Sequence, residues 1–449
     1  MRKIVCIALL VFGAFFVLTS CDINEETPAP RLTDAADVQT VDWTAEHVRL
    51  ISRNASNTIQ RVDFGEGVDL MPGYYQWDYW PILNLDGTIA IINGFRVMVV
   101  LTAPDTVMSG KRHDIVRHRY AISRDGISWE DKGMVFSEDA ILGSRQWAGS
   151  AYYDRGSGQL YFYYTATGEK GELLGGDGNG GGVSGGPGNT GDGDGISYEQ
   201  RIALSTAMVS GDSETVEFEN FSQHRVILEA DGQIYQRATG IDETGTVFAF
   251  RDPFVFQDPE TKKFYLTFTG REAGDISTYN GAVGLAEAVG NDLSEWKLLP
   301  PLVVTNINSE LERPHFVRCD KKYYLYFSTH IEKFSPEVQD RVNSPEGLYG
   351  FASDKFLGPY EPLNGSALVA GNPIEDPYAT FSWHVLLDNT VLSNTNYYNI
   401  EPGLEVGDFG ALGEEWDRIH FGGTLAPRLT ISVKGTKVLL TGKLPPSLP

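Results

Sequence analysis

An acidic side chain between two tryptophans is the first feature of this chain that could do chemistry. Asp78 lies in the motif WDYWP, residues 77–81. The apolar faces of a sugar ring stack on indole while its hydroxyls need polar partners, so an aromatic-flanked carboxylate suits a sugar ligand. The motif is equally typical of a core strand whose aspartate caps a turn. Asp78 is therefore a candidate catalytic residue only in combination with other acidic residues.

Two further motifs each join an acid to an arginine and close on a proline. They are FRDP, residues 250–253, and ELERP, residues 310–314. Proline stiffens the local chain, and arginine can lower the pKa of a neighbouring carboxylate or fork onto vicinal hydroxyls. Each acid taken alone is also explained by a capped turn or a surface ion pair.

Together these acids match what cleavage of a glycosidic bond requires. In retaining enzymes an ionised carboxylate attacks the anomeric carbon, and a protonated carboxyl roughly 5–5.5 Å away donates to the leaving oxygen. Asp78 is the candidate nucleophile, and Glu312, whose pKa the neighbouring Glu310 raises, is the candidate general acid. Asp252, beside Arg251, is expected to stay ionised and to hold hydroxyls as the ring flattens.

Short strands must position these acids. Runs of β-branched and aromatic residues recur between turns, as in Phe95–Leu101, Leu160–Thr165, Phe264–Phe268, Tyr323–Phe327 and Lys437–Leu440. Helical periodicity is weak, and residues 46–57 are the best helix candidate. The pattern predicts an all-β sandwich, barrel or propeller, and the length favours a propeller, in which the first strand of each blade meets a central channel. No strict repeat gives the number of blades.

Composition and the N-terminus set the expected compartment. The chain has 449 residues and a net charge of -24, which argues against nucleic acid or an anionic membrane as a partner. Residues 1–21 are typical of a secretory signal, and residues 18–21 resemble a bacterial lipobox in which Cys21 is lipidated. An ordinary signal peptide that happens to contain a cysteine is the alternative. No membrane-spanning helix is expected, because the apolar run is short.

Two further segments are expected to lie outside the packed core. Residues 22–40 are typical of a polar tether, and residues 175–195, rich in Gly and Asp, of a flexible insertion. The insertion lacks the spacing and the closing glutamate of an EF-hand, and we expect neither a metal nor a cofactor. Residues 41–449 are therefore expected to form one catalytic domain.

Five motifs occur in the order found in glycoside hydrolase family 68, the levansucrases, inulosucrases and related β-fructofuranosidases, which the chain resembles from about residue 40 to 440. They are WDYWP (77–81), WAGS (147–150), FRDP (250–253), ELERP (310–314) and FGGTLAP (421–427). The resemblance implies a five-bladed β-propeller with a central funnel-shaped active site. It also implies retaining transfer of fructose from sucrose, with Asp78 as nucleophile, Glu312 as acid/base and Asp252 as transition-state stabiliser. The substrate-binding residues that it implies are Trp77, Trp147, Ser150, Arg251, Glu310, Arg313 and His330.

The resemblance also sets expectations for activity and location. It implies a levansucrase-like sucrose 6-fructosyltransferase that passes fructose to a fructan or oligosaccharide chain or to water. The alternatives are a hydrolytic β-fructofuranosidase and a non-catalytic fructan-binding lipoprotein. His330 stands where many Gram-negative members carry histidine, and Ser309 stands where Gram-positive members place a calcium-binding aspartate. Because of Ser309 we expect that calcium site to be absent. The resemblance and the leader together predict a monomeric, extracytoplasmic, lipid-anchored protein of a Gram-negative bacterium.

Overall fold

The computed structural model describes residues 37–63, 65–169, 197–238, 246–274, 277–290, 292–340, 342–401 and 403–449. The predicted signal peptide with Cys21, the insertion at 175–195 and the tether up to residue 36 lie outside these residues. Among the helices that are described, none is long and apolar enough to cross a bilayer.

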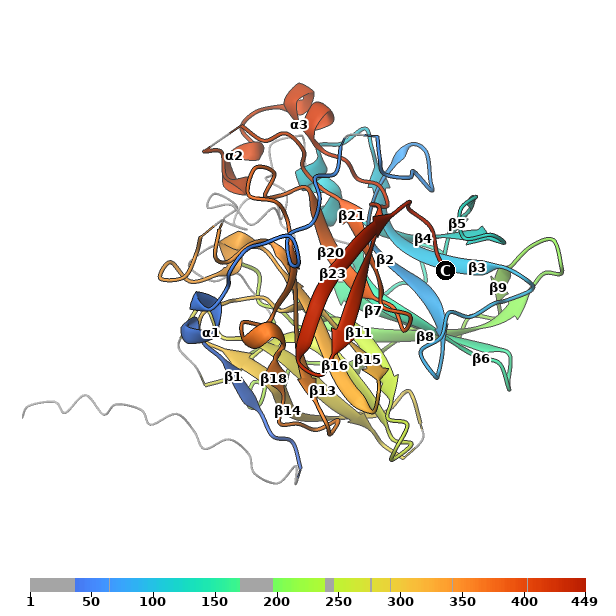
Figure 1. The fold of residues 1–449 in the computed structure, drawn as a ribbon. Coiled ribbons are helices and arrows are strands. Elements are labelled where there is room, and N and C mark those ends of the chain that lie inside the picture. The colour runs from blue at the N-terminus through green and yellow to red at the C-terminus, as the bar shows by residue number, and fades with distance from the viewer. Residues whose placement is uncertain are drawn as a thin grey trace, which may run out of the picture.

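Five antiparallel blades make up most of the described chain (Figure 1). The first two blades contain β2 (Tyr74–Asn84), β3 (Arg96–Pro104), β4 (Arg117–Ser123) and β5 (Glu130–Met134), then β6 (Arg145–Asp154), β7 (Gln159–Thr167), β8 (Gln200–Ser210), β9 (Glu217–Glu219) and β10 (Arg225–Leu228). The third contains β11 (Arg251–Gln257), β12 (Phe264–Arg271), β13 (Gly281–Ala288) and β14 (Trp296–Thr305), with β1 (Val41–Trp43) paired in parallel to β14. The last two contain β15 (Glu312–Cys319), β16 (Lys322–Thr329), β17 (Gly347–Ser353), β18 (Glu361–Pro362) and β19 (Leu368–Gly371), then β20 (Thr380–Val385), β21 (Thr390–Thr395), β22 (Arg428–Lys434) and β23 (Lys437–Leu444).

The blades form a five-bladed β-propeller, as predicted. Their innermost strands, β2, β6, β11, β15 and β20, contact one another in turn around the axis, with β20 returning to β2. A short parallel pairing of residues 82–84 with residues 151–153 joins the first two blades into one continuous sheet. The five sequence runs predicted as strands lie in β3, β7, β12, β16 and β23.

Helices are few in the described residues. They are α1 (Ala45–Arg49), α2 (Val406–Phe409) and α3 (Glu414–His420), with 3₁₀ turns η1 (Ser109–Asp114), η2 (Ile331–Lys333) and η3 (Leu363–Gly365). The helix predicted over residues 46–57 is wrong beyond Arg49. Side chains compete with the helical backbone there: Asn54 Oδ1 accepts from the Ser56 amide, and Asn57 Nδ2 donates to the Ser52 carbonyl.

The innermost strands share a backbone irregularity that a search for repeated residues does not reveal. Each carries a β-bulge, beginning at Trp77, Trp147, Arg251, Glu312 and Phe381. In four of them the next residue is left-handed: Asp78 (φ 48), Asp252 (φ 62), Arg313 (φ 50) and Ser382 (φ 60). Bulges re-aim side chains and tend to lie beside active sites, so these strained positions mark the site.

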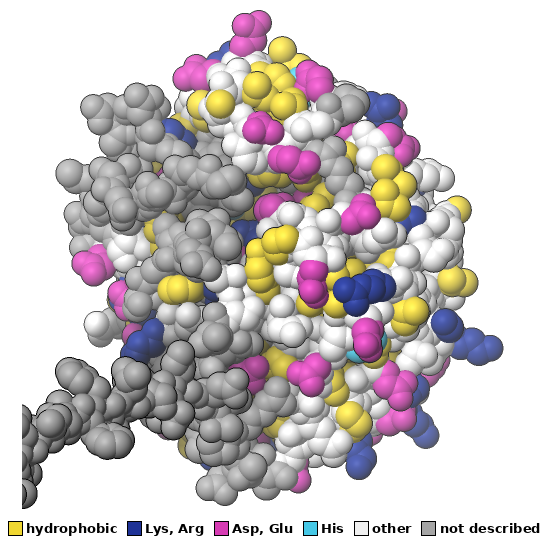
Figure 2. Space-filling model, turned by 90° about the vertical axis from the view of Figure 1, so that its left-hand side faces the viewer, with side chains coloured by type: hydrophobic (Ala, Val, Ile, Leu, Met, Phe, Trp, Pro, Cys, Tyr) yellow, Lys and Arg dark blue, Asp and Glu magenta, His cyan; other side chains and the backbone are white. Residues whose placement is uncertain are grey.

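The surface is acidic, as the composition requires. Asp and Glu side chains are spread over the face shown in Figure 2, interspersed with basic and apolar ones. On this face the acidic side chains are dispersed and form no single cluster. A dispersed negative surface keeps a protein apart from polyanions and does not hinder a neutral sugar.

Candidate active site

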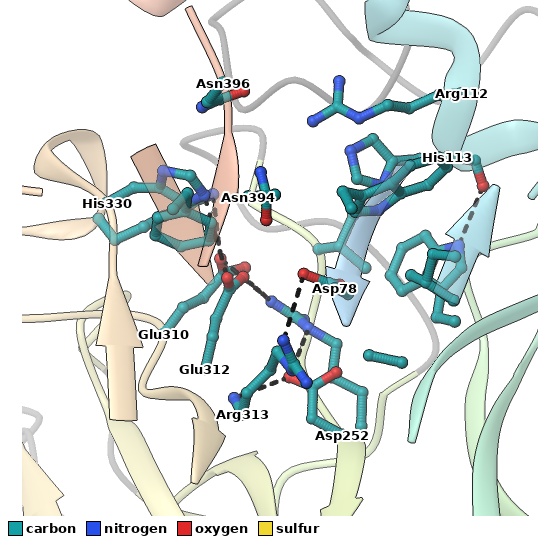
Figure 3. Close-up of a pocket in the computed structure, with 18 of the residues that line it drawn as sticks. Asp78, Arg112, His113, Asp252, Glu310, Glu312, Arg313, His330, Asn394 and Asn396 are labelled. Carbon is teal, nitrogen blue, oxygen red and sulfur yellow. Dashed lines mark hydrogen bonds and ion pairs between the residues drawn. The ribbon is translucent and has the colours of Figure 1, made fainter. Parts of the chain in front are cut away.

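One pocket at the centre of the propeller gathers nine of the ten predicted catalytic and substrate-binding residues (Figure 3). These nine are Trp77, Asp78, Trp147, Arg251, Asp252, Glu310, Glu312, Arg313 and His330. Most come from the bulges of the inner strands, where two successive side chains face the axis. Val406 of α2 also lines the pocket, so the pocket reaches the side of the propeller on which α2 and α3 lie (Figure 1).

The exception is Ser150, which lines a second, smaller cavity instead. It holds the same place after its bulge as Trp80, Phe254, His315 and His384, and all five of these side chains lie around that cavity. Asp252 and Arg313 line both spaces and so separate them. Ser150 therefore sits one layer below the pocket, and its contact with substrate stays a prediction.

Arg251 holds the acids of two blades together. Its Nη2 lies 2.7 Å from Glu312 Oε1 and 3.1 Å from Glu310 Oε2, and its Nε lies 3.7 Å from Asp252 Oδ2. Lys333 adds a second cation 3.3 Å from Glu310 Oε2. All of these groups are largely buried, so each charge is balanced by a partner at short range.

Asp252 is fixed by hydrogen bonds as well as by charge. Thr269 Oγ1 donates to Asp252 Oδ2 at 2.8 Å, and the Arg313 amide donates to the same oxygen at 3.1 Å. The Asp252 amide donates to Thr165 Oγ1 at 3.0 Å. A carboxylate held in this way keeps one orientation while a substrate changes shape beside it.

Asp78 enters the pocket from the first blade. Figure 3 shows its carboxylate directed into the space that Glu312 and Asp252 also face. Arg313 Nη1 lies 3.9 Å from Asp78 Oδ1, Nη2 donates to the Tyr79 carbonyl at 2.8 Å, and Nη1 also donates to Ser382 Oγ. Arg313 therefore ties three inner strands together under the candidate nucleophile.

Glu312 and Glu310 have opposite protonation preferences. Burial raises the pKa of Glu312 to about 8. The cations Arg251 and His330 lower this pKa, but the negative charges of Glu310 and Asp252 offset much of that lowering. Burial also acts on Glu310, but Arg251 and Lys333 outweigh it and hold the pKa of Glu310 well below its usual range. Glu312 is thus the carboxyl that carries a proton at neutral pH, as a general acid must.

Burial and charge act in opposite directions on the pKa of Asp252. The sequence places it beside Arg251, which favours the ionised form. In the structure burial is the largest influence, and together with the nearby Asp78 it raises the pKa of Asp252 despite Arg251 and the hydrogen bond from Thr269. Arg251 stabilises three acids at once and is therefore less effective for any one of them.

Charged, aromatic and amide groups that the motifs did not identify also line the pocket wall. They are Arg112, His113, Glu332, Lys333, Phe381, Asn394, Asn396 and Tyr397. Arg112 lies over the ring of Trp77 at 5.3 Å, and Trp147 Nε1 donates to the His113 carbonyl at 3.0 Å. Asn394 and Asn396 alternate at the end of β21, so strand periodicity was a usable signal for them. Nothing in the local sequence marks η1, which supplies Arg112 and His113.

One group of side chains has the composition of metal ligands. Among the described residues, His330, Glu332 and Glu346 bring one nitrogen and two carboxylate oxygens within 4.8 Å of one another. Glu346 Oε2 accepts a hydrogen bond of 2.8 Å from His330 Nδ1. His330 Nδ1, the nitrogen that a metal would need as a ligand, is thus already hydrogen-bonded to Glu346.

Comparison with known proteins agrees with the geometry. Residues 32–280 and 271–442 match the levansucrase/invertase family model, glycoside hydrolase family 68. The levansucrase LscA of Pseudomonas savastanoi pv. glycinea is 30% identical over 437 residues, covering 88% of this chain and 92% of its own. A levansucrase of Erwinia amylovora is 30% identical over 401 residues, covering 80% and 84%.

The solved structure of the inulosucrase from Halalkalicoccus jeotgali bound to kestose superimposes with a TM-score of 0.80 and 37% identity, covering 92% of this chain and 98% of that one. The levansucrase of Gluconacetobacter diazotrophicus, at 22% identity and a TM-score of 0.72, shares the fold. Sequence motifs, blade order and the acid-lined pocket therefore lead to one assignment. The chain belongs to glycoside hydrolase family 68.

Proposed function

We propose that this protein is a levansucrase-type fructosyltransferase that cleaves sucrose, releases glucose and transfers fructose to a fructan chain or to water. The observation that carries the proposal is that Asp78 and Glu312 line one pocket of a family 68 propeller, where burial raises the pKa of Glu312. Levansucrase relatives that match across most of the chain support the substrate.

The reaction proceeds in two displacements with retention. Asp78 attacks the anomeric carbon of the fructosyl unit while Glu312 donates its proton to the glycosidic oxygen, so glucose leaves and a fructosyl ester on Asp78 remains. Glu312 then takes the proton of an acceptor hydroxyl, which attacks the same carbon and frees Asp78. Asp252, fixed by Thr269 and the Arg313 amide, is placed to hold the sugar hydroxyls as positive charge develops on the ring.

The products of sucrose test this proposal. Purified protein is incubated with concentrated sucrose, and glucose and free fructose are quantified separately. A fructosyltransferase leaves glucose in excess over fructose and a fructan in the balance, whereas equal amounts of both sugars make the protein a hydrolytic β-fructofuranosidase. Sucrose that stays intact while fructan is retained in a pull-down would make it a binding protein. Linkage analysis of any polymer then separates a levansucrase from an inulosucrase.

The pH dependence of sucrose cleavage follows from the protonation of Glu312. Its pKa is raised to about 8, so the acid form persists through neutral pH and is lost as pH rises through that value. We expect kcat/KM for sucrose to fall tenfold per pH unit on the alkaline side of about pH 8, because kcat/KM reports the ionisation of the free enzyme. Initial rates of glucose release in a series of buffers at constant ionic strength measure this. An alkaline limb two units lower would remove Glu312 as the acid.

We further propose that the chain is lipidated at Cys21 and held on the extracytoplasmic side of a membrane. The support is the leader itself, with its basic start, apolar run and lipobox-like residues 18–21. In a bacterial host that processes lipoproteins, a labelled fatty acid is expected to mark the wild type and not Cys21→Ser. Label that persists in Cys21→Ser, or a wild type without label, would contradict the anchor.

A further inference from the structure

His330 places its two ring nitrogens between carboxylates from separate segments of the fourth blade. It follows β16 and stacks on Phe381, with ring centroids 3.4 Å apart and planes 17° from parallel. Its Nε2 lies 3.9 Å from Glu312 Oε2, and its Nδ1 donates to Glu346 Oε2 at 2.8 Å. The stacked ring has little freedom to turn, so the hydrogen bond at Nδ1 fixes the direction in which Nε2 points into the pocket.

Glu346 is an unusual residue to find there. Its side chain is fully buried, and it does not line the pocket. The segment that carries it is held firmly, because the Glu346 carbonyl accepts from the Asn372 amide at 3.1 Å and the Pro345 carbonyl accepts from Tyr349 Oη at 2.7 Å. Burying a carboxylate is unfavourable by several kcal/mol unless it is paired. The imidazole of His330 is the main group that offsets this burial, with a smaller contribution from Asn396, and burial still raises the pKa of Glu346 to about 7.

We propose that Glu346 is a positioning residue for fructosyl transfer: it accepts the hydrogen bond from His330 Nδ1 and directs Nε2 toward Glu312. The inference rests on the proposed function and deepens it. An ion pair that served stability alone would not need its second nitrogen within reach of the reacting carboxyl. Histidine residues that do chemistry are commonly oriented in this way by a carboxylate on the opposite nitrogen.

Charged groups from every neighbouring element bear on His330. Glu312 faces it from β15, Glu332 from η2, where Oε1 lies 4.0 Å from Nδ1, and Glu346 from the segment before β17. Burial lowers the pKa of His330, but Glu346, then Glu332 and Glu312, outweigh burial and raise it to about 9. On the opposite wall, His113 is held neutral, because burial and nearby cations, His330 among them, lower its pKa.

The direction of the expected effect follows from these charges. His330 is cationic at the pH where Glu312 titrates, and the cation lowers the pKa of Glu312. In Glu346→Gln the imidazole loses its strongest anionic partner, so the pKa of His330 falls. Glu312 then titrates beside a less positively charged ring, so the pKa of Glu312 rises. The alkaline limb of kcat/KM therefore moves to higher pH, which lost packing would not cause.

The test compares wild type, Glu346→Gln and Glu337→Gln on sucrose. We expect Glu346→Gln to shift the alkaline limb upward by roughly 0.5–1 pH unit and to lower kcat by about tenfold. Glu337 is exposed in the loop between η2 and β17, so its variant removes a carboxylate there without touching the pair, and its profile is expected to match wild type. Glucose release by wild type is measured first: an inactive wild type refutes the proposed function, whereas an active one with an unshifted Glu346→Gln refutes this inference.

A spectroscopic readout is independent of turnover. Nitrogen-15 and proton NMR of the imidazoles is expected to show one downfield N–H signal in wild type that is lost both in Glu346→Gln and in His330→Gln. The double variant is expected to be no slower than His330→Gln, because Glu346 acts only through the ring. If Glu346→Gln does not fold, a downfield signal that survives in His330→Gln overturns the inference. Activity lost on dialysis against EDTA and restored by zinc would also overturn it, since a metal would then hold Nδ1.

Discussion

Asp78→Asn is expected to abolish glucose release from sucrose, with kcat lowered by at least about 10⁴-fold. The amide cannot form the fructosyl ester, so the first displacement is lost while the shape of the side chain is kept. The backbone also tolerates the change, because Asp78 has φ 48 and asparagine is among the residues that adopt this conformation most readily. Coupled-enzyme detection of glucose measures the rate, and circular dichroism verifies the fold.

A matched control lies on the same hairpin. Asp86 is exposed in the turn after β2, where its Oδ1 accepts from Thr88, and it stands apart from the pocket. Asp86→Asn makes the identical chemical change and is expected to leave glucose release unaltered. Sucrose binding to Asp78→Asn, followed by calorimetry, separates lost chemistry from lost affinity. Wild-type turnover in Asp78→Asn would end the assignment of the nucleophile.

The strands and the acids could be predicted because their signals are local. Runs of β-branched and aromatic residues mark β3 and β16, and the motifs around Asp78, Asp252 and Glu312 carry their functional residues within a few positions. The blade count could not be obtained this way, because the repeat lies in the backbone. Trp77 and Phe381 begin equivalent bulges, yet the residues at the five equivalent places do not share a chemical type.

Other properties of the site depend on features that only the three-dimensional structure supplies. Ser150 belongs to a motif of the site, but the bulge at Trp147 sends it to the lower layer of side chains. Asp252 was expected to follow its neighbour Arg251, and burial proved the stronger influence on its pKa. Glu346 had no motif at all, since its importance depends on a contact with His330 sixteen positions away in the chain.

Glu312→Gln is expected to lower kcat on sucrose by about 10³-fold, which is the usual value of a general acid and base. Glutamine neither donates the proton that glucose needs in order to leave nor takes one from the acceptor. The alkaline limb near pH 8 is expected to disappear as well, because the group that titrates there is gone. Rates across the pH range, from the glucose assay, measure both effects.

A change of substrate and nucleophile makes the role of Glu312 specific. A fructosyl donor with a leaving group that needs no proton, such as fluoride, bypasses the acid step, and azide attacks the Asp78 ester without a base. We therefore expect the fluoride donor and azide together to restore most of the turnover of Glu312→Gln and none of that of Asp78→Asn. Equal failure of both variants would mean that removing Glu312 releases Arg251, whose Nη2 lies 2.7 Å from Glu312 Oε1, and collapses the site. Rescue of Glu312→Gln alone would instead show that Glu312 transfers the proton and that Asp78 forms the bond to the fructosyl carbon.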